Sequence, residues 1–108
     1  MARKKKSRSI VQRFDDYFGT GTLEDWQRLC GDIGLDANLS SITQCRKVLK
    51  TVHINIHDLL DAVDQGRLPH RFGNARELAN YTVNTRRIFP KKKVKEMGPV
   101  KALMRHIL

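Results

Sequence analysis

Two runs of basic residues have the types and spacing to bind an anionic partner. Residues 1–8 carry five basic side chains and no acid, and the run from Lys91 to Lys95 has three consecutive lysines and a fourth after one valine. Because lysine and arginine neutralise phosphate groups, such runs favour nucleic acid. The candidate contact residues are Arg3, Lys4, Lys5, Lys6, Arg8, Arg86, Arg87, Lys91, Lys92, Lys93 and Lys95.

The positive charge of the chain is concentrated at its two ends. Of the net charge of +10, residues 1–8 contribute +5 and residues 86–108 contribute +7, whereas residues 9–85 carry −2. A near-neutral body with two cationic ends attracts polyanions over roughly a Debye length, ~8–10 Å at physiological salt. We therefore expect the ends, and not the body, to engage a partner.

Nucleic acid and an import receptor are the two partners that these runs favour. The spacing of Lys92, Lys93 and Lys95 is one that acidic grooves of import receptors accept in extended form. Alternatively, the protein is an interaction domain whose basic ends only solubilise it or direct it to the nucleus. Stacking on single strands is not indicated, because the four Phe, two Tyr and one Trp lie mostly on predicted core stripes and not among the lysines.

No cluster of residues indicates catalysis or a metal site. His53 and His57 are four residues apart, but Asn55 is expected to begin a helix between them, so they would not share a helix face. Cys30 and Cys45 lie on predicted core stripes, where buried free thiols are the ordinary outcome. No pair of acids lies in an apolar setting that would raise a pKa for acid–base catalysis. We expect no enzyme activity, no catalytic residue, no metal and no cofactor.

Polar residues at helix-capping positions divide the chain into amphipathic segments. Each precedes an apolar stripe with helical spacing. These predicted caps are Ser9, Thr22, Ser41, Asn55 and Asn74. Gly34 and Gly66 are placed to end two of the helices, and Pro90 bars continuation of the fifth. The predicted stripes run over Ile10–Phe18, Leu23–Ile33, Ile42–Val52, Ile56–Val63 and Leu78–Ile88.

The remaining segments are shorter or mixed in pattern. Val52–Ile56 alternates apolar and polar residues as a strand does, but it has no partner strand, and a tight connection is the preferred interpretation. Gly98-Pro99 begins a last helix that runs to Ile107. Helices this short must pack together to be stable. We predict an all-α fold, an irregular or orthogonal bundle of five or six short helices over residues 9–108, with a disordered basic arm at residues 1–8.

Composition indicates one small intracellular domain. With 108 residues, of which 40% are hydrophobic and 30% charged, the chain has room for one modest core. No apolar run approaches the ~20 residues that cross a bilayer, and no apolar stretch follows the basic start as it would in a secretory signal. With only two cysteines, we expect a nuclear or cytoplasmic protein that binds no membrane. The oligomeric state stays open.

Several motifs together resemble a family of small fungal helical proteins. They are Trp26-x-x-Leu29-Cys30, Cys45-Arg46, Thr51 to Ile56 with Asp58-Leu59, and Tyr81-Thr82-x-x-Thr85 followed by Phe89-Pro90. The likeness covers residues about 22–108. The sequence departs from the family's pattern at Val52, which separates Thr51 from His53. The resemblance implies a helical domain and, because the family has no established activity, implies nothing about chemistry.

Overall fold

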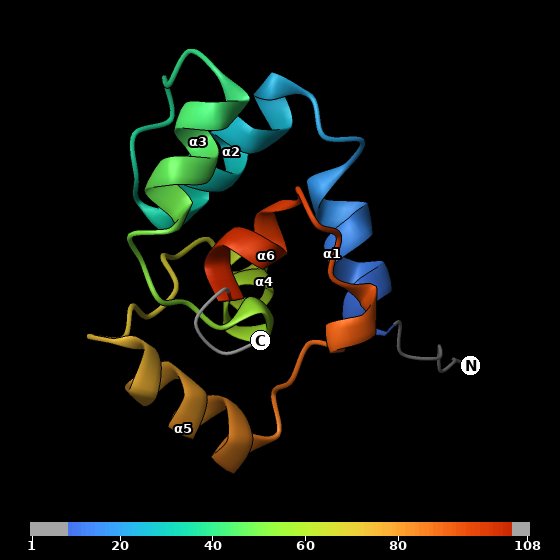
Figure 1. The fold of residues 1–108 in the computed structure, drawn as a ribbon, viewed down its shortest axis with the longest axis vertical. Coiled ribbons are helices and arrows are strands. Elements are labelled where there is room, and N and C mark those ends of the chain that lie inside the picture. The colour runs from blue at the N-terminus through green and yellow to red at the C-terminus, as the bar shows by residue number, and fades with distance from the viewer. Residues whose placement is uncertain (1–8, 105–108) are drawn as a thin grey trace.

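The computed structural model describes residues 9–104, which fold into six α-helices and one 3₁₀ turn without a strand in that range (Figure 1). The predicted all-α bundle is therefore confirmed. The predicted arm at residues 1–8, with five of the candidate contact residues, lies outside the described residues, as do residues 105–107 of the predicted last helix. The elements are α1 (Ile10–Phe18), α2 (Leu23–Ile33), α3 (Ile42–Leu49), α4 (Ile56–Gln65), α5 (Ala75–Thr85), η1 (Lys91–Lys93) and α6 (Pro99–Met104).

The five predicted N-caps are confirmed, and they explain where α1 to α5 begin. Each capping side chain accepts a hydrogen bond from the backbone N–H three residues on, at distances from 2.9 Å at Asn74 to 3.2 Å at Thr22 and Ser41. At α2 the capping box is complete, because Asp25 also accepts from the Thr22 N–H at 3.0 Å. Each cap satisfies one of the backbone donors that a helix start leaves free.

Helix α5 is shorter than the predicted stripe. It ends at Thr85 because Arg86 adopts the left-handed conformation at φ 59°, so the prediction that the helical face runs to Ile88 is wrong by one turn. Ile88 is 53% exposed, and Thr82 is the buried residue of the last turn instead. The chain beyond α5 is thereby turned back along α4 and toward the lysines.

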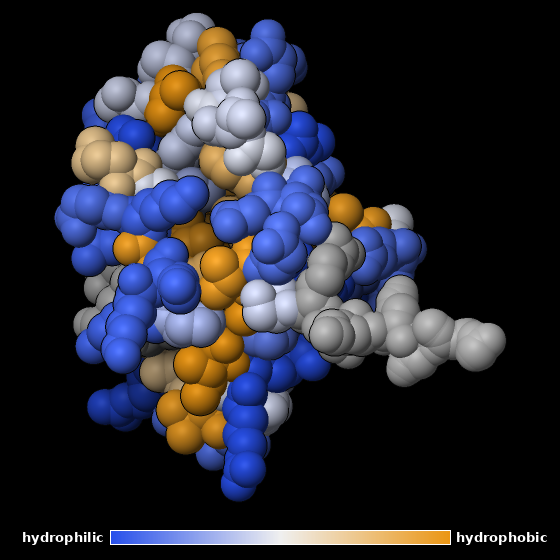
Figure 2. Space-filling view, turned by 90° about the vertical axis from the view of Figure 1, so that its right-hand side faces the viewer, coloured by the Kyte–Doolittle hydropathy of each residue, from blue (hydrophilic) through white to orange (hydrophobic). Residues whose placement is uncertain are grey.

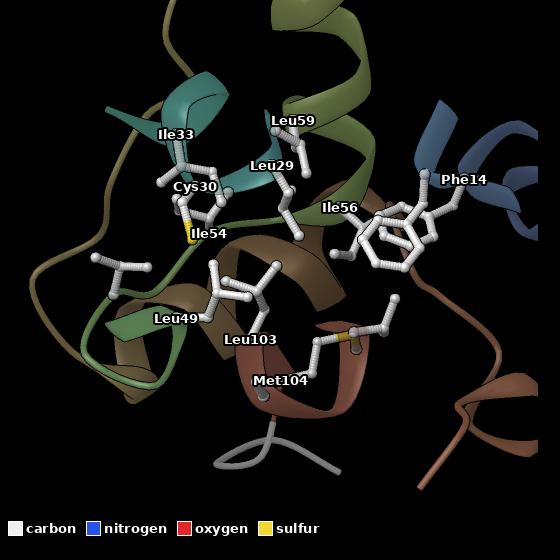
Figure 3. Close-up of a cluster of buried hydrophobic side chains, with 14 of the residues drawn as sticks. Phe14, Leu29, Cys30, Ile33, Leu49, Ile54, Ile56, Leu59, Leu103 and Met104 are labelled. Atoms are coloured by element: carbon white, nitrogen blue, oxygen red, sulfur yellow. The ribbon is translucent and has the colours of Figure 1, made fainter. Parts of the chain in front are cut away.

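The helices pack around one apolar core. In Figure 1, α2 and α3 lie side by side at one end of the molecule, α1 and α4 pack together, and α6 lies against α3. Leu29, Leu49, Leu59 and Leu103, from four different helices, point toward one another in Figure 3. Each of these leucines is at most 3% exposed. Helices of 6 to 11 residues are marginal alone, so this burial holds them in place.

The connection between α3 and α4 is extended but forms no strand. Ile54 within it is fully buried, and its neighbour Asn55 is only 4% exposed. The Asn55 side-chain amide donates to the Thr82 hydroxyl at 3.1 Å and to the Arg87 carbonyl at 2.9 Å. One side chain thus caps α4 and fastens both the end of α5 and the segment that follows it.

The two thiols are buried and free. Cys30 and Cys45 are both fully inaccessible to solvent. Burial, together with the neighbouring Cys45, raises the pKa of the Cys30 thiol to about 12. The thiolate is the reactive form of cysteine. We therefore expect no reaction with Ellman's reagent in native buffer at neutral pH, and release of both thiols in urea. Rapid reaction of the native protein would contradict the burial of these residues.

Candidate functional site

We define the basic connector as Lys91, Lys92, Lys93 and Lys95. The first three form the 3₁₀ turn η1, and Lys95 follows it after Val94. Its backbone is closed by hydrogen bonds from the Lys93 N–H to the Pro90 carbonyl at 3.0 Å and from the Val94 N–H to the Lys91 carbonyl at 3.2 Å. Phe89 before the turn is 5% exposed, and Val94 packs against the core. The four lysines are exposed, whereas the backbone that carries them is anchored at both ends.

The lysines of the basic connector have no carboxylate partner within the described part of the chain. Ion pairs in that part are made by arginines instead, namely Arg13, Arg28 and Arg87. Glu96 is the one acid close to the connector in sequence. The charge of these four lysines is therefore not neutralised by an ion pair with a carboxylate of residues 9–104.

Arg87 is placed differently from the lysines that follow it. Its Nε donates to Asp58 at 2.8 Å, and its guanidinium also pairs with Asp61. Asp61 further accepts from Arg13 at 3.3 Å, so α1, α4 and the segment after α5 meet at these carboxylates. Because Asp58 and Asp61 already neutralise the Arg87 guanidinium, Arg87 is removed from the candidate contact residues for an anionic partner. Arg86 is exposed and stays within it.

The Asp61 carboxylate makes stability depend on pH. Although burial alone would raise the pKa of Asp61, hydrogen bonds from Arg87 and Arg13 lower it below its usual value of 3.8. A depressed folded-state pKa contributes stability above the usual value, and that contribution is lost as pH falls through the lowered pKa. We expect the urea midpoint to fall in acid, and Asp61→Asn to reduce this dependence. An unchanged acid profile in Asp61→Asn would contradict the assignment.

A pocket of about 370 Å³ opens beside the basic connector. It lies between the end of α1, the turn after it, α3 and the segment that leads into α6. Figure 2 views the molecule from the side of α1 and η1, and apolar groups are exposed there along a hollow between hydrophilic residues. Lys93 and Lys95 line the pocket on one side, so the connector forms part of its rim.

Four aromatic rings line the inner part of this pocket. They are Phe14, Phe18, Trp26 and Phe89, each between 4% and 8% exposed. Phe14 stacks on Phe18 with centroids 5.6 Å apart, and Phe18 meets Trp26 edge to face at 5.5 Å. The expectation that Phe14, Phe18 and Trp26 serve the core is confirmed, and Phe89, which lay on no predicted stripe, is buried with them. The expectation that they lie away from the lysines is wrong, because tertiary packing brings Lys93 and Lys95 to the same pocket.

Arg46 supplies a third cation at the pocket, and it was not among the predicted contact residues. Its guanidinium carbon lies 5.1 Å from the centre of the Trp26 ring, and its Nη2 donates to the Met97 carbonyl at 3.1 Å. Its Nε is buried and has no acceptor among the described residues. The motif Cys45-Arg46 contained the residue, but no local pattern distinguished it from a solvated arginine.

The other candidates for chemistry are spread out. His57 has a ring nitrogen 3.1 Å from the Ile88 carbonyl, and Asn55 begins α4 between the two histidines, as predicted. Within residues 9–104 no three His, Cys, Asp or Glu side chains form a group that could hold a metal. No helix described in the structure is long and apolar enough to cross a membrane.

Comparison with protein-family models, curated proteins and solved structures finds no match to this chain. The resemblance to small fungal helical proteins stays a prediction. Any function must therefore be argued from the basic connector and the pocket themselves.

Proposed function

We propose that the protein is a non-enzymatic binding module whose basic connector contacts the phosphates of a nucleic acid. The observation that carries this proposal is the set of four exposed lysines without carboxylate partners in the described residues. Three of them lie on the 3₁₀ turn, and the fourth, Lys95, follows directly after Val94. Because the backbone of the turn is already ordered, lysines on it lose less conformational freedom on binding a polyanion than lysines on a free chain. Release of condensed counterions then drives binding.

The geometry of the connector favours phosphates over the groove of an import receptor. Such a groove takes the lysines in extended form, whereas Lys91–Lys93 form a 3₁₀ turn. Extending the turn would break its two backbone hydrogen bonds and pull Val94 from the core. Phosphates impose no such demand, because lysine contacts them as a point charge on a mobile stem.

Removing two lysines is expected to lower the salt dependence of binding. Each lost phosphate contact reduces the slope of log K against log salt by ~0.7 for a single strand and ~0.9 for a duplex. Lys92→Ala with Lys93→Ala should therefore reduce the slope by about 1.4–1.8. Anisotropy of a labelled oligonucleotide between about 50 and about 200 mM salt measures it.

The matched control removes the same charge elsewhere. Lys47→Ala with Arg76→Ala changes two exposed cations that do not line the pocket. This control should keep a slope near that of the unmodified protein. No binding of any nucleic acid at low salt would remove the proposal, and equal losses in both double variants would show that the contacts are not at the basic connector.

A further inference from the structure

The pocket beside the basic connector has the size and lining of a ligand site. Its volume of about 370 Å³ lies within the ~300–1,000 Å³ that ligand pockets occupy. Its walls are largely apolar and aromatic, and its polar side chains are few, as such sites require. The aromatic rings are already packed against one another, so the inner part of the pocket is preformed.

The charges around the pocket select an anion. Arg46, Lys93 and Lys95 line it, and Asp15 is the one acid among the lining residues. The Arg46 guanidinium lies over Trp26 and donates to the Met97 carbonyl, and no carboxylate of residues 9–104 forms an ion pair with it. A complementary ligand has a compact apolar or aromatic group for the interior and negative charge at the mouth.

We infer that this pocket holds one unstacked base of a single-stranded nucleic acid, with the flanking phosphates on Lys93, Lys95 and Arg46. The inference rests on the proposed function and adds to it the strandedness of the partner. Phosphates bound by the basic connector carry bases a few bonds away. An unpaired strand can turn a base into a pocket without breaking a base pair, whereas a duplex must first unpair and unstack it. Aromatic walls combined with a cationic track are the means by which proteins bind single strands.

Comparing the affinities of three ligands distinguishes the contribution of the base from that of the phosphates. They are a single-stranded oligonucleotide, an abasic strand of equal length, and the duplex. Stacking of one base on an open aromatic face contributes ~1–3 kcal/mol. Because the pocket rings are only 4–8% exposed, we expect the lower end of this range, with the single strand binding about 5-fold more tightly than the abasic strand. Trp26 is the only tryptophan and lines the pocket, so its fluorescence should change with the base-bearing strand and not with the abasic one.

A blocking variant tests the location of the base. Ile42 is half-buried at the pocket and its neighbour Thr43 is exposed outside it. Ile42→Trp should abolish the preference for the base-bearing strand and leave abasic binding unchanged, as measured by anisotropy of labelled strands. Thr43→Trp should keep the preference, and thermal melting of both variants shows that they are folded.

The outcomes distinguish this inference from the function it extends. If no strand binds at low salt, both fail. If single strand, abasic strand and duplex bind alike, the pocket inference is overturned and the phosphate-binding function stands. If a free nucleoside monophosphate binds as tightly as the single strand, the pocket is a small-ligand site and the inference is overturned as well.

Discussion

Asn55→Ala is expected to destabilise the protein by about 2–4 kcal/mol, more than any other single polar substitution in α4 or α5. The variant loses the cap of α4, and it also removes the donor to the Thr82 hydroxyl and the Arg87 carbonyl. A cap contributes ~1 kcal/mol, and an abandoned buried acceptor costs ~1–3 kcal/mol more. Urea unfolding followed by circular dichroism measures the change.

Asn74→Ala is the matched control. Asn74 caps α5 but is exposed, and within residues 9–104 its side chain accepts a hydrogen bond from the Glu77 N–H alone. It should cost ~1 kcal/mol. Equal destabilisation by the two variants would contradict the role of Asn55 as a link between α4 and the end of α5. Amide exchange in α5 should also accelerate in Asn55→Ala, because its last turn loses the bond to Thr82.

Leu103→Ala is the second substitution with a large expected effect, at about 2–5 kcal/mol. Leu103 is 3% exposed and lies in a helix of only six residues, α6, which packs on α3. The truncated side chain leaves a cavity among Leu29, Leu49 and Leu59, the leucines grouped in Figure 3. The loss of unfolding free energy is measured as a lower denaturant midpoint, with the slope of the free energy against denaturant concentration unchanged.

Lys101→Ala in the same helix is its control. Lys101 is half-buried, and its removal opens no cavity in the leucine cluster. Surface substitutions of this kind usually change stability by ~0.5 kcal/mol or less. A Leu103→Ala variant as stable as Lys101→Ala would mean that α6 is not part of the cooperative core.

Helix starts could be predicted from the sequence because the interactions that set them are local. The side chain of Thr22 and the N–H of Asp25 are one turn apart whatever the rest of the chain does. The same holds for Gly34, whose left-handed conformation depends on its own missing side chain. The N-cap side chains predicted five helix starts, and Gly34 predicted the end of α2, without reference to tertiary structure.

The end of α5 could not be predicted in this way. Arg86 in the left-handed conformation is unfavourable by itself, so propensity favours continuing the helix. The turn is stabilised by distant groups: Asn55 binds the Arg87 carbonyl, and Asp58 with Asp61 binds the Arg87 side chain. The net charge of residues 86–108 likewise placed Arg87 among the candidate contact residues. Its partners Asp61 and Asp58 lie 26 and 29 residues away in the sequence, so no local pattern showed that they neutralise it.

The candidate site shows the same division between local and distant information. Helical spacing assigned Phe14, Phe18 and Trp26 to the core, and they are buried there. Periodicity does not show that one side of this aromatic group stays open. It also does not show that Phe89 and the lysines pack beside the group, because Phe89 follows Trp26 by 63 residues. The adjacency of Phe89-Pro90 to Lys91 was the one sequence signal that joined the two features.

The most direct test is a two-dimensional amide NMR spectrum recorded while a single-stranded oligonucleotide is added at low salt. We predict that shifts will concentrate on the backbone amides of residues 91–98, on Gly19–Gly21 and on the Trp26 indole, the groups at and around the pocket. The exposed face of α5 near Arg76 should stay unchanged. Shifts confined to α5, or none while the strand is bound, would contradict the assignment of the partner to the basic connector and its pocket.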